Sequence, residues 1–61
     1  MPRLEKWLLI EEHLYGNIYD DNRFLDGSPV RTSKVKEINE AEHTAQTKNT
    51  LYVLGEKLVI E

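Results

Sequence analysis

A chain of 61 residues with no cysteine has few ways to become a stable domain. A domain of about 60 residues buries only about 60% of the surface that its unfolded chain exposes, so its stability is marginal. Because cysteine is absent, neither a disulfide nor a Cys-based zinc site can reinforce the fold. The remaining routes are a compact barrel and association between copies. We therefore expect a single small domain over residues 1–61 that forms a homo-oligomer.

Charge and hydrophobicity narrow the class of protein further. Hydrophobic residues make up 39% and charged residues 31% of the chain, a balance typical of soluble globular domains. The net charge of −3 argues against non-specific binding of duplex DNA, which needs a broad cationic surface. No apolar run is long enough to span a membrane, and the N-terminus lacks the apolar core of a signal peptide. We expect a cytoplasmic protein without membrane association.

Residues 3–12 form the first apolar segment, and they allow two interpretations. Leu4, Trp7 and Leu8 have helical spacing. Alternating positions, interrupted by the charge of Lys6, instead define one face of a strand, which consists of Leu4, Leu8 and Ile10. Periodicity alone does not decide so short an apolar run. We favour a strand, because the residues that follow have strand character.

Residues 14–20 alternate as a half-buried strand does. The two faces consist of Leu14, Gly16 and Ile18 and of Tyr15, Asn17 and Tyr19. The β-branched and aromatic residues at these positions favour a strand. Gly16 is expected to mark a β-bulge or a bend at a corner of the sheet.

Residues 29–39 form the third predicted strand. Val30 and Thr32 alternate, whereas Val35 is out of phase with them. One extra residue near Ser33 would restore the register, so we predict a β-bulge there.

The last part of the chain predicts a β-hairpin. Residues 42–47 and 50–54 flank Lys48–Asn49, and asparagine tolerates the left-handed backbone that tight turns require. Gly55 ends the second of these strands, and residues 57–61 form a short apolar tail. About five short strands with tight connections result. We therefore predict an all-β fold, a small antiparallel barrel or roll of SH3-like or OB-like size.

The polar loop 20–28 separates the second predicted strand from the third. Asp26–Gly27 is expected to form a turn in which Gly27 has a positive φ angle, where a Cβ atom is costly. Aligned as a calcium loop that begins at Asn22, the segment places Phe24 at the third ligand position. It places Ser33 at the twelfth, where calcium needs a bidentate glutamate. We therefore predict a turn and no metal site.

The residues that could carry catalysis lack a supporting motif. Ser28, Thr32 and Ser33 could serve as nucleophiles with His43 as the base, but no nucleophile-elbow pattern surrounds them. Hydroxyls at turns and strand starts ordinarily bond the backbone. His13 and His43 have no flanking pair of metal ligands. We expect a protein that is not an enzyme and that uses no cofactor.

Basic residues concentrate between the loop and the third strand. Four of the eight lysines and arginines lie there, namely Arg23, Arg31, Lys34 and Lys36. Arginine can hold phosphate through two parallel hydrogen bonds, hydroxyls add donors, and an aromatic ring can stack on a base. The predicted site for a phosphate-bearing ligand consists of Arg23, Phe24, Arg31, Thr32 and Ser33. Alternatively, these cations pair with the acidic residues of the same loop, which are Asp20, Asp21 and Asp26.

The pattern RFxDGxxVxTSxV at residues 23–35, followed by YxLGE at residues 52–56, resembles a family of short bacteriophage and prophage proteins. The resemblance spans about residues 7–56, and it carries no functional residues that can be transferred. It implies a phage accessory protein, and many such proteins counteract host defences. They do so by sequestering a nucleotide messenger or by binding a defence protein directly.

Three functions follow as expectations. The leading one is sequestration of a phosphate-bearing nucleotide by a non-catalytic protein in the cytoplasm of the infected cell. The alternative is an inhibitor that binds a host defence protein through an exposed strand edge or the 20–33 loop. The third is an interaction module for single-stranded nucleic acid, which the negative net charge disfavours.

Overall fold

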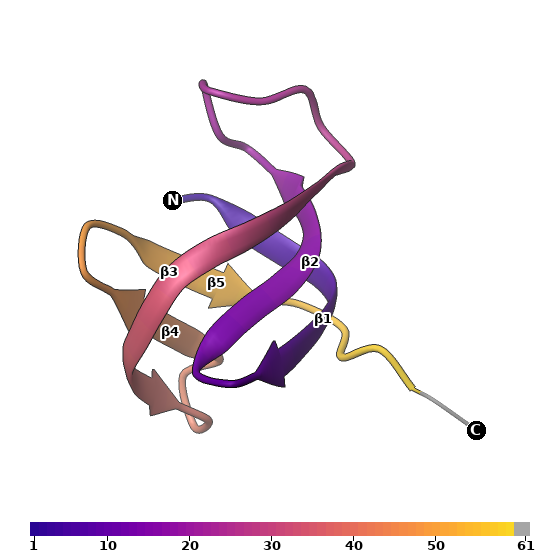
Figure 1. The fold of residues 1–61 in the computed structure, drawn as a ribbon. Helices are drawn as coiled ribbons and strands as arrows, with labels where there is room; N and C mark the ends of the chain where they lie inside the picture. Colours follow the sequence, from indigo (N-terminus) through magenta and orange to yellow (C-terminus); the bar gives the residue numbers. More distant parts are fainter. Residues whose placement is uncertain (60–61) are drawn as a thin grey trace.

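The computed structural model describes residues 1–59, which form a closed β-barrel (Figure 1). The strands are β1 (Arg3–Ile10), β2 (His13–Tyr19), β3 (Ser28–Asn39), β4 (Thr44–Thr47) and β5 (Leu51–Leu54). Consecutive strands pair antiparallel, and β5 pairs parallel with β1 to close the barrel. The predicted all-β fold class is confirmed, and the first apolar segment is a strand. The end of the predicted apolar tail, residues 60–61, lies outside the described residues.

The barrel interior is small and receives side chains from every strand. The buried hydrophobic core consists of Leu4, Leu14, Ile18, Ala45, Tyr52 and Leu54, and the partly buried side chains packed against it are Trp7, Val30, Val35 and Ile38. Of the two faces predicted for residues 14–20, the one that carries Leu14 and Ile18 faces the interior. Full burial of one aliphatic side chain stabilises a fold by about 1.5–3 kcal/mol, so each core residue matters in a domain of marginal stability.

β1 contains a β-bulge that its sequence marks with a charge. Between the pairs Glu5–Asn17 and Leu8–Tyr15, β1 has one residue more than β2. Lys6 lies in this interval with a φ angle of 51°, in the left-handed region. The residue that interrupts the alternation of the segment is thus the point where the strand changes phase.

The bulge decides which side chains of β1 face the core. Trp7 packs against the core and Ile10 is exposed, so the prediction that Leu4, Leu8 and Ile10 share one face of the strand is wrong beyond Leu4. Gly16 of β2 lies opposite the bulge. A Cβ atom on Gly16 would be 3.1 Å from the carbonyl oxygen of Glu5 and 3.3 Å from Cα of Trp7. Gly16 was expected to mark a bulge or a bend, and the structure has a β-bulge beside it whose extra residue belongs to β1.

The bulge predicted near Ser33 is also confirmed. One extra residue of β3 separates two of its pairs with β2, which are Arg31–Tyr15 and Lys34–His13. The change of phase lets both Thr32 and Val35 face the interior. β3 can therefore curve around the barrel while it keeps an inner face on both sides of the bulge.

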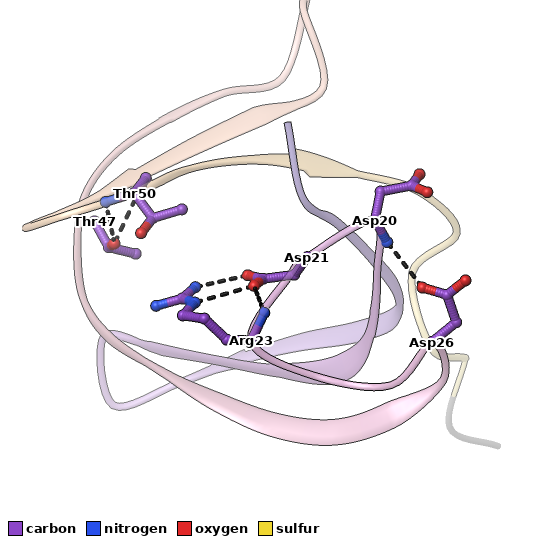
Figure 2. Close-up of polar contacts among 6 residues, drawn as sticks. All are labelled: Asp20, Asp21, Arg23, Asp26, Thr47 and Thr50. Atoms are coloured by element: carbon purple, nitrogen blue, oxygen red, sulfur yellow. Dashed lines mark hydrogen bonds and ion pairs between the residues drawn. The ribbon is translucent and has the colours of Figure 1, made fainter.

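The predicted hairpin joins β4 to β5 at Lys48–Asn49, as expected. Thr47 closes the turn, because its N–H donates to the carbonyl oxygen of Thr50 at 2.9 Å and its hydroxyl accepts from the N–H of Thr50 at 3.3 Å (Figure 2). β4 begins at Thr44, slightly later in the chain than predicted.

After β5 the chain continues alongside β1. The N–H of Gly55 donates to the carbonyl oxygen of Leu4 at 2.8 Å, and the N–H of Leu58 donates to that of Trp7 at 3.0 Å. Trp7 also forms a parallel bridge with Lys57. These bonds extend the seam that closes the barrel. Among the residues described, no helical segment has the length and apolar character needed to cross a bilayer.

Candidate binding site

The loop of residues 20–27 joins β2 to β3 and projects from one end of the barrel (Figure 1). Hydrogen bonds at its base hold it against β2. The N–H of Gly27 donates to the carbonyl oxygen of Ile18 at 2.6 Å, and the side-chain amide of Asn17 donates to the carbonyl oxygen of Gly27 at 3.0 Å. The return of the chain into β3 is therefore fixed by β2 itself.

Two aspartate side chains shape the backbone within the loop. Oδ1 of Asp26 accepts from the N–H of Asp20 at 3.0 Å, and Oδ1 of Asp21 accepts from the N–H of Arg23 at 2.8 Å (Figure 2). Asp20 has a φ angle of 58° and Gly27 one of 89°, so the positive φ predicted for Gly27 is confirmed. Aspartate side chains that accept hydrogen bonds from nearby backbone N–H groups favour turns over regular strands.

Asp21 holds the side chain of Arg23. Nε of Arg23 donates to Oδ1 at 3.0 Å, and Nη2 donates to Oδ2 at 2.7 Å (Figure 2). The side chain of Asp21 is only 6% exposed, whereas that of Arg23 is 57% exposed. The planar fork that could hold a phosphate therefore holds a carboxylate of the same loop, which is the alternative predicted for this arginine.

This ion pair changes the pKa values of both groups. Hydrogen bonds from the side chain and the backbone of Arg23 lower the pKa of Asp21 from its ordinary value of 3.8 to about 2. The pKa of Arg23 is raised, first by its hydrogen bond to Asp21 and then by the hydroxyl of Tyr52. Tyr52 is a core residue of β5, so the guanidinium reaches the rim of the barrel interior. The lowered pKa of Asp21 and the raised pKa of Arg23 keep this pair ionised near neutral pH.

Phe24 and Leu25 form the apolar tip of the loop. Leu25 is 84% exposed and Phe24 is 45% exposed. The guanidinium carbon of Arg23 lies 5.5 Å from the centre of the Phe24 ring, which is a cation–π distance. The hydroxyl of Ser28 donates to the carbonyl oxygen of Leu25 at 2.7 Å. The tip thus combines exposed apolar side chains with a hydrogen-bonded backbone.

The other predicted site residues lie on β3 and are divided between its two faces. Arg31 and Ser33 are exposed, and Arg31 is paired across the strands with Tyr15. Thr32 is only 5% exposed and faces the interior. Its hydroxyl accepts from the N–H of Leu14 at 3.1 Å and donates to the carbonyl oxygen of Ser33 at 2.8 Å. The hydroxyl of Thr32 is therefore occupied by backbone groups, away from the outer surface that carries Arg31.

Two residues that shape this end of the molecule were missed by sequence reasoning. Leu25 is an apolar residue within a mostly polar loop. Its position next to Phe24 is a sequence signal for an apolar tip. Tyr52 lies far from Arg23 in the chain, and no spacing in the sequence connects them. The contact between them depends on barrel closure.

Comparison with known proteins gives no relative on which to base a function. No protein-family model matches the chain, and neither the curated proteins nor the solved structures contain a significant match.

Proposed function

We propose that the protein is a small binding module that docks on a partner protein through the tip of the 20–27 loop. Phe24 and Leu25 are its apolar anchors. The observation that carries this proposal is the exposure of Leu25 on a backbone fixed by hydrogen bonds. Apolar and aromatic side chains that fill a pocket of the partner supply most of the energy of many interfaces. A preorganised loop loses less conformational entropy when it binds, which favours affinity.

Charged groups near the tip provide a polar rim around its apolar side chains. The exposed guanidinium of Arg23 and the carboxylate of Asp20 both precede the apolar pair in the same loop. Asp20 is itself held by Arg3 at 3.3 Å. An apolar centre with a polar rim is the common anatomy of protein–protein contacts.

The resemblance to short phage proteins favours a host defence protein as the partner. In that setting the module acts by covering a surface of the defence protein, without a catalytic step of its own. The protein is then an anti-defence accessory protein that works in the cytoplasm of the infected cell.

Substitution of the tip tests this proposal. The purified protein is immobilised together with its Leu25→Asp and Leu25→Met variants and exposed to a lysate of the bacterial host. We expect one retained protein that Leu25→Asp loses and Leu25→Met keeps, because methionine preserves the apolar bulk. With that partner purified, Leu25→Asp should weaken binding by about 2 kcal/mol or more, roughly 30-fold. Equal retention by all three proteins contradicts the proposal.

A phosphate-bearing ligand is a second candidate, and the pair formed by Tyr15 and Arg31 favours it. The two residues are opposite each other in the register of β2 and β3, and both are exposed, so ring and cation share one face. A base could stack on Tyr15 while a phosphate bonds Arg31. Arg31→Ala should then weaken nucleotide binding about tenfold or more, since a charge-assisted hydrogen bond is worth roughly 1.5–3 kcal/mol. A calorimetric screen of cyclic and linear nucleotides that yields no heat contradicts this candidate.

Association between copies is a further part of the proposal. Exposed apolar side chains occur near the end of β1 and in the segment that follows β5, and they are Leu9, Ile10, Leu58 and Val59. The bridge between Trp7 and Lys57 brings the start of the second segment against β1. Clustered apolar exposure of this kind ordinarily marks an interaction surface.

A further inference from the structure

A hollow of about 220 Å³ lies where the β3–β4 turn meets β1 and the segment after β5, and it is lined by Trp7, Glu40, His43, Leu54 and Lys57. The β3–β4 turn is at the end of the barrel opposite the 20–27 loop (Figure 1). The hollow is therefore separate from the loop and from the outer face of Arg31.

Trp7 and Leu54 supply the apolar lining of the hollow. The bulge in β1 turns the indole of Trp7 toward the core side, and Nε1 donates to the carbonyl oxygen of Gly55 at 3.0 Å. Leu54 is a buried core residue. Because the only donor of the indole is already bonded within the protein, its ring contributes apolar surface to the hollow.

Three ionisable side chains of both signs line the same hollow. The ammonium of Lys57 lies 5.4 Å from the centre of the Trp7 ring, at cation–π distance. Glu40 and His43 come from the β3–β4 turn. A lysine, a glutamate and a histidine therefore line the hollow together with its apolar residues.

The turn that carries Glu40 and His43 has an unusual backbone. His43 has a φ angle of 55°, a region that residues with a Cβ atom seldom adopt. Two bonds hold this conformation, one from the N–H of Leu54 to the carbonyl oxygen of His43 at 2.7 Å and one from the N–H of His43 to that of Glu40 at 3.4 Å. The two bonds fix the turn against Leu54, so the positions of Glu40 and His43 beside the hollow are set by the backbone.

We propose that this hollow binds a free α-amino acid with an apolar side chain. The ammonium of Lys57 bonds the α-carboxylate, and an N–H of His43 adds a second donor to it. The carboxylate of Glu40 accepts from the α-ammonium. The apolar side chain of the ligand lies against Trp7 and Leu54.

Charge and size select this class of ligand. A phosphate dianion would be repelled by Glu40, and a simple cation would be repelled by Lys57. A zwitterion matches both signs at once, which is how charge complementarity gives specificity. Pockets for drug-sized ligands have volumes of about 300–1,000 Å³, so a hollow of about 220 Å³ suits a single amino acid.

Trp7 is the only tryptophan of the chain, so its fluorescence reports on this site alone. The full-length protein is titrated with L-leucine, with N-acetyl-L-leucine, which lacks the ammonium, and with L-leucinamide, which lacks the carboxylate. We expect L-leucine to change the emission saturably in the millimolar range. Each blocked ligand should bind at least about tenfold more weakly, because one charge-assisted contact is lost. No saturable response to L-leucine, or an equal response to all three ligands, overturns the proposal.

Variants of the two charged residues assign the contacts. Glu40→Gln should remove the preference for L-leucine over its N-acetyl derivative, and Lys57→Met should remove the preference over L-leucinamide. Lys36→Met, which removes an exposed cation on β3, is the matched control and should preserve both preferences. Far-UV circular dichroism checks that each variant is folded. Selectivity that persists in both site variants, or that is lost in the control, overturns the assignment.

Discussion

The guanidinium of Arg23 donates two parallel hydrogen bonds to the carboxylate of Asp21, at 3.0 and 2.7 Å. The same guanidinium is close to the hydroxyl of Tyr52, a core residue of β5. A local ion pair within the loop therefore also connects the loop to a strand that is distant in sequence. Loss of the pair between Asp21 and Arg23 should therefore loosen the loop that carries Phe24 and Leu25.

Acid should weaken this connection. The pKa of Asp21 falls from 3.8 to about 2 in the folded protein, so between these values the folded state keeps the carboxylate ionised while the unfolded chain protonates it. The stabilisation is complete above the unfolded value and is lost as the pH falls from about 4 to about 2. Asp21→Asn should flatten the dependence of Tm on pH in this window only. Because Arg23 is largely exposed, salt should reduce the difference. Identical Tm profiles of both proteins from about pH 2 to about pH 7 contradict this prediction.

Gly27 should resist substitution by a residue with a Cβ atom. Its φ angle of 89° is strained for any L-residue, and a β-branched side chain is the least tolerant. Gly27→Val should lower the free energy of unfolding by about 1 kcal/mol or more, measured by urea denaturation. An unchanged midpoint and slope would show that the loop readily adopts another turn.

The barrel could be predicted from the alternation of apolar residues, and the sequence also located one bulge. Val35 is out of phase with Val30 and Thr32, and a single extra residue was the only simple way to keep one inner face. For the bulge at Lys6, Gly16 indicated an irregularity at this level of the sheet, but nothing in the sequence showed that the extra residue lies in β1. The apolar run that follows it has no polar positions to show which of its side chains face inward.

The candidate site was less predictable than the fold. Arg23 and Asp21 are separated by a single residue, so their pairing was open to prediction as an alternative. Thr32 was assigned to a ligand although its alternation with Val30 already indicated an interior position. The contact of the loop with Tyr52 depends on the closure of β5 onto β1, which no local pattern encodes.

The hydroxyl of Thr32 should stabilise the barrel. It accepts the N–H of Leu14 at 3.1 Å in a buried environment, so Thr32→Val keeps the side-chain shape but leaves a donor without its partner. This should cost about 1–3 kcal/mol of unfolding free energy. Thr32→Ser keeps the hydroxyl and loses a single methyl group, so it should cost less, about 1 kcal/mol. Urea denaturation compares the two variants, and a larger loss for Thr32→Ser contradicts the role given to the hydroxyl.

The turn between β1 and β2 offers a stabilising substitution. Glu11 and Glu12 have φ angles of 49° and 69°, where two-residue hairpin turns favour asparagine and glycine. Glu12→Gly relieves the backbone, and the ion pair it removes, from Glu12 to Lys34 at 3.3 Å, is exposed and worth little. We expect a gain of about 0.5–1 kcal/mol. Glu37→Gly, at an exposed position within β3, is the control and should destabilise instead. A loss of stability in Glu12→Gly contradicts the turn geometry.

Association between copies should depend on the apolar residues at the end of β1 and in the segment after β5. Ile10 and Val59 are 48% and 75% exposed. Exposed apolar side chains do not stabilise a monomer, whereas they can be buried in a contact between copies. Multi-angle light scattering at micromolar concentration should therefore give at least a dimer for the unmodified protein. Ile10→Asp and Val59→Asp should shift it toward the monomer, because each places a charge in a surface that must lose water on association. Leu25→Asp, at the opposite tip, should leave the mass unchanged. A stable monomer of the unmodified protein contradicts the prediction, and dissociation by Leu25→Asp would move the contact to the loop.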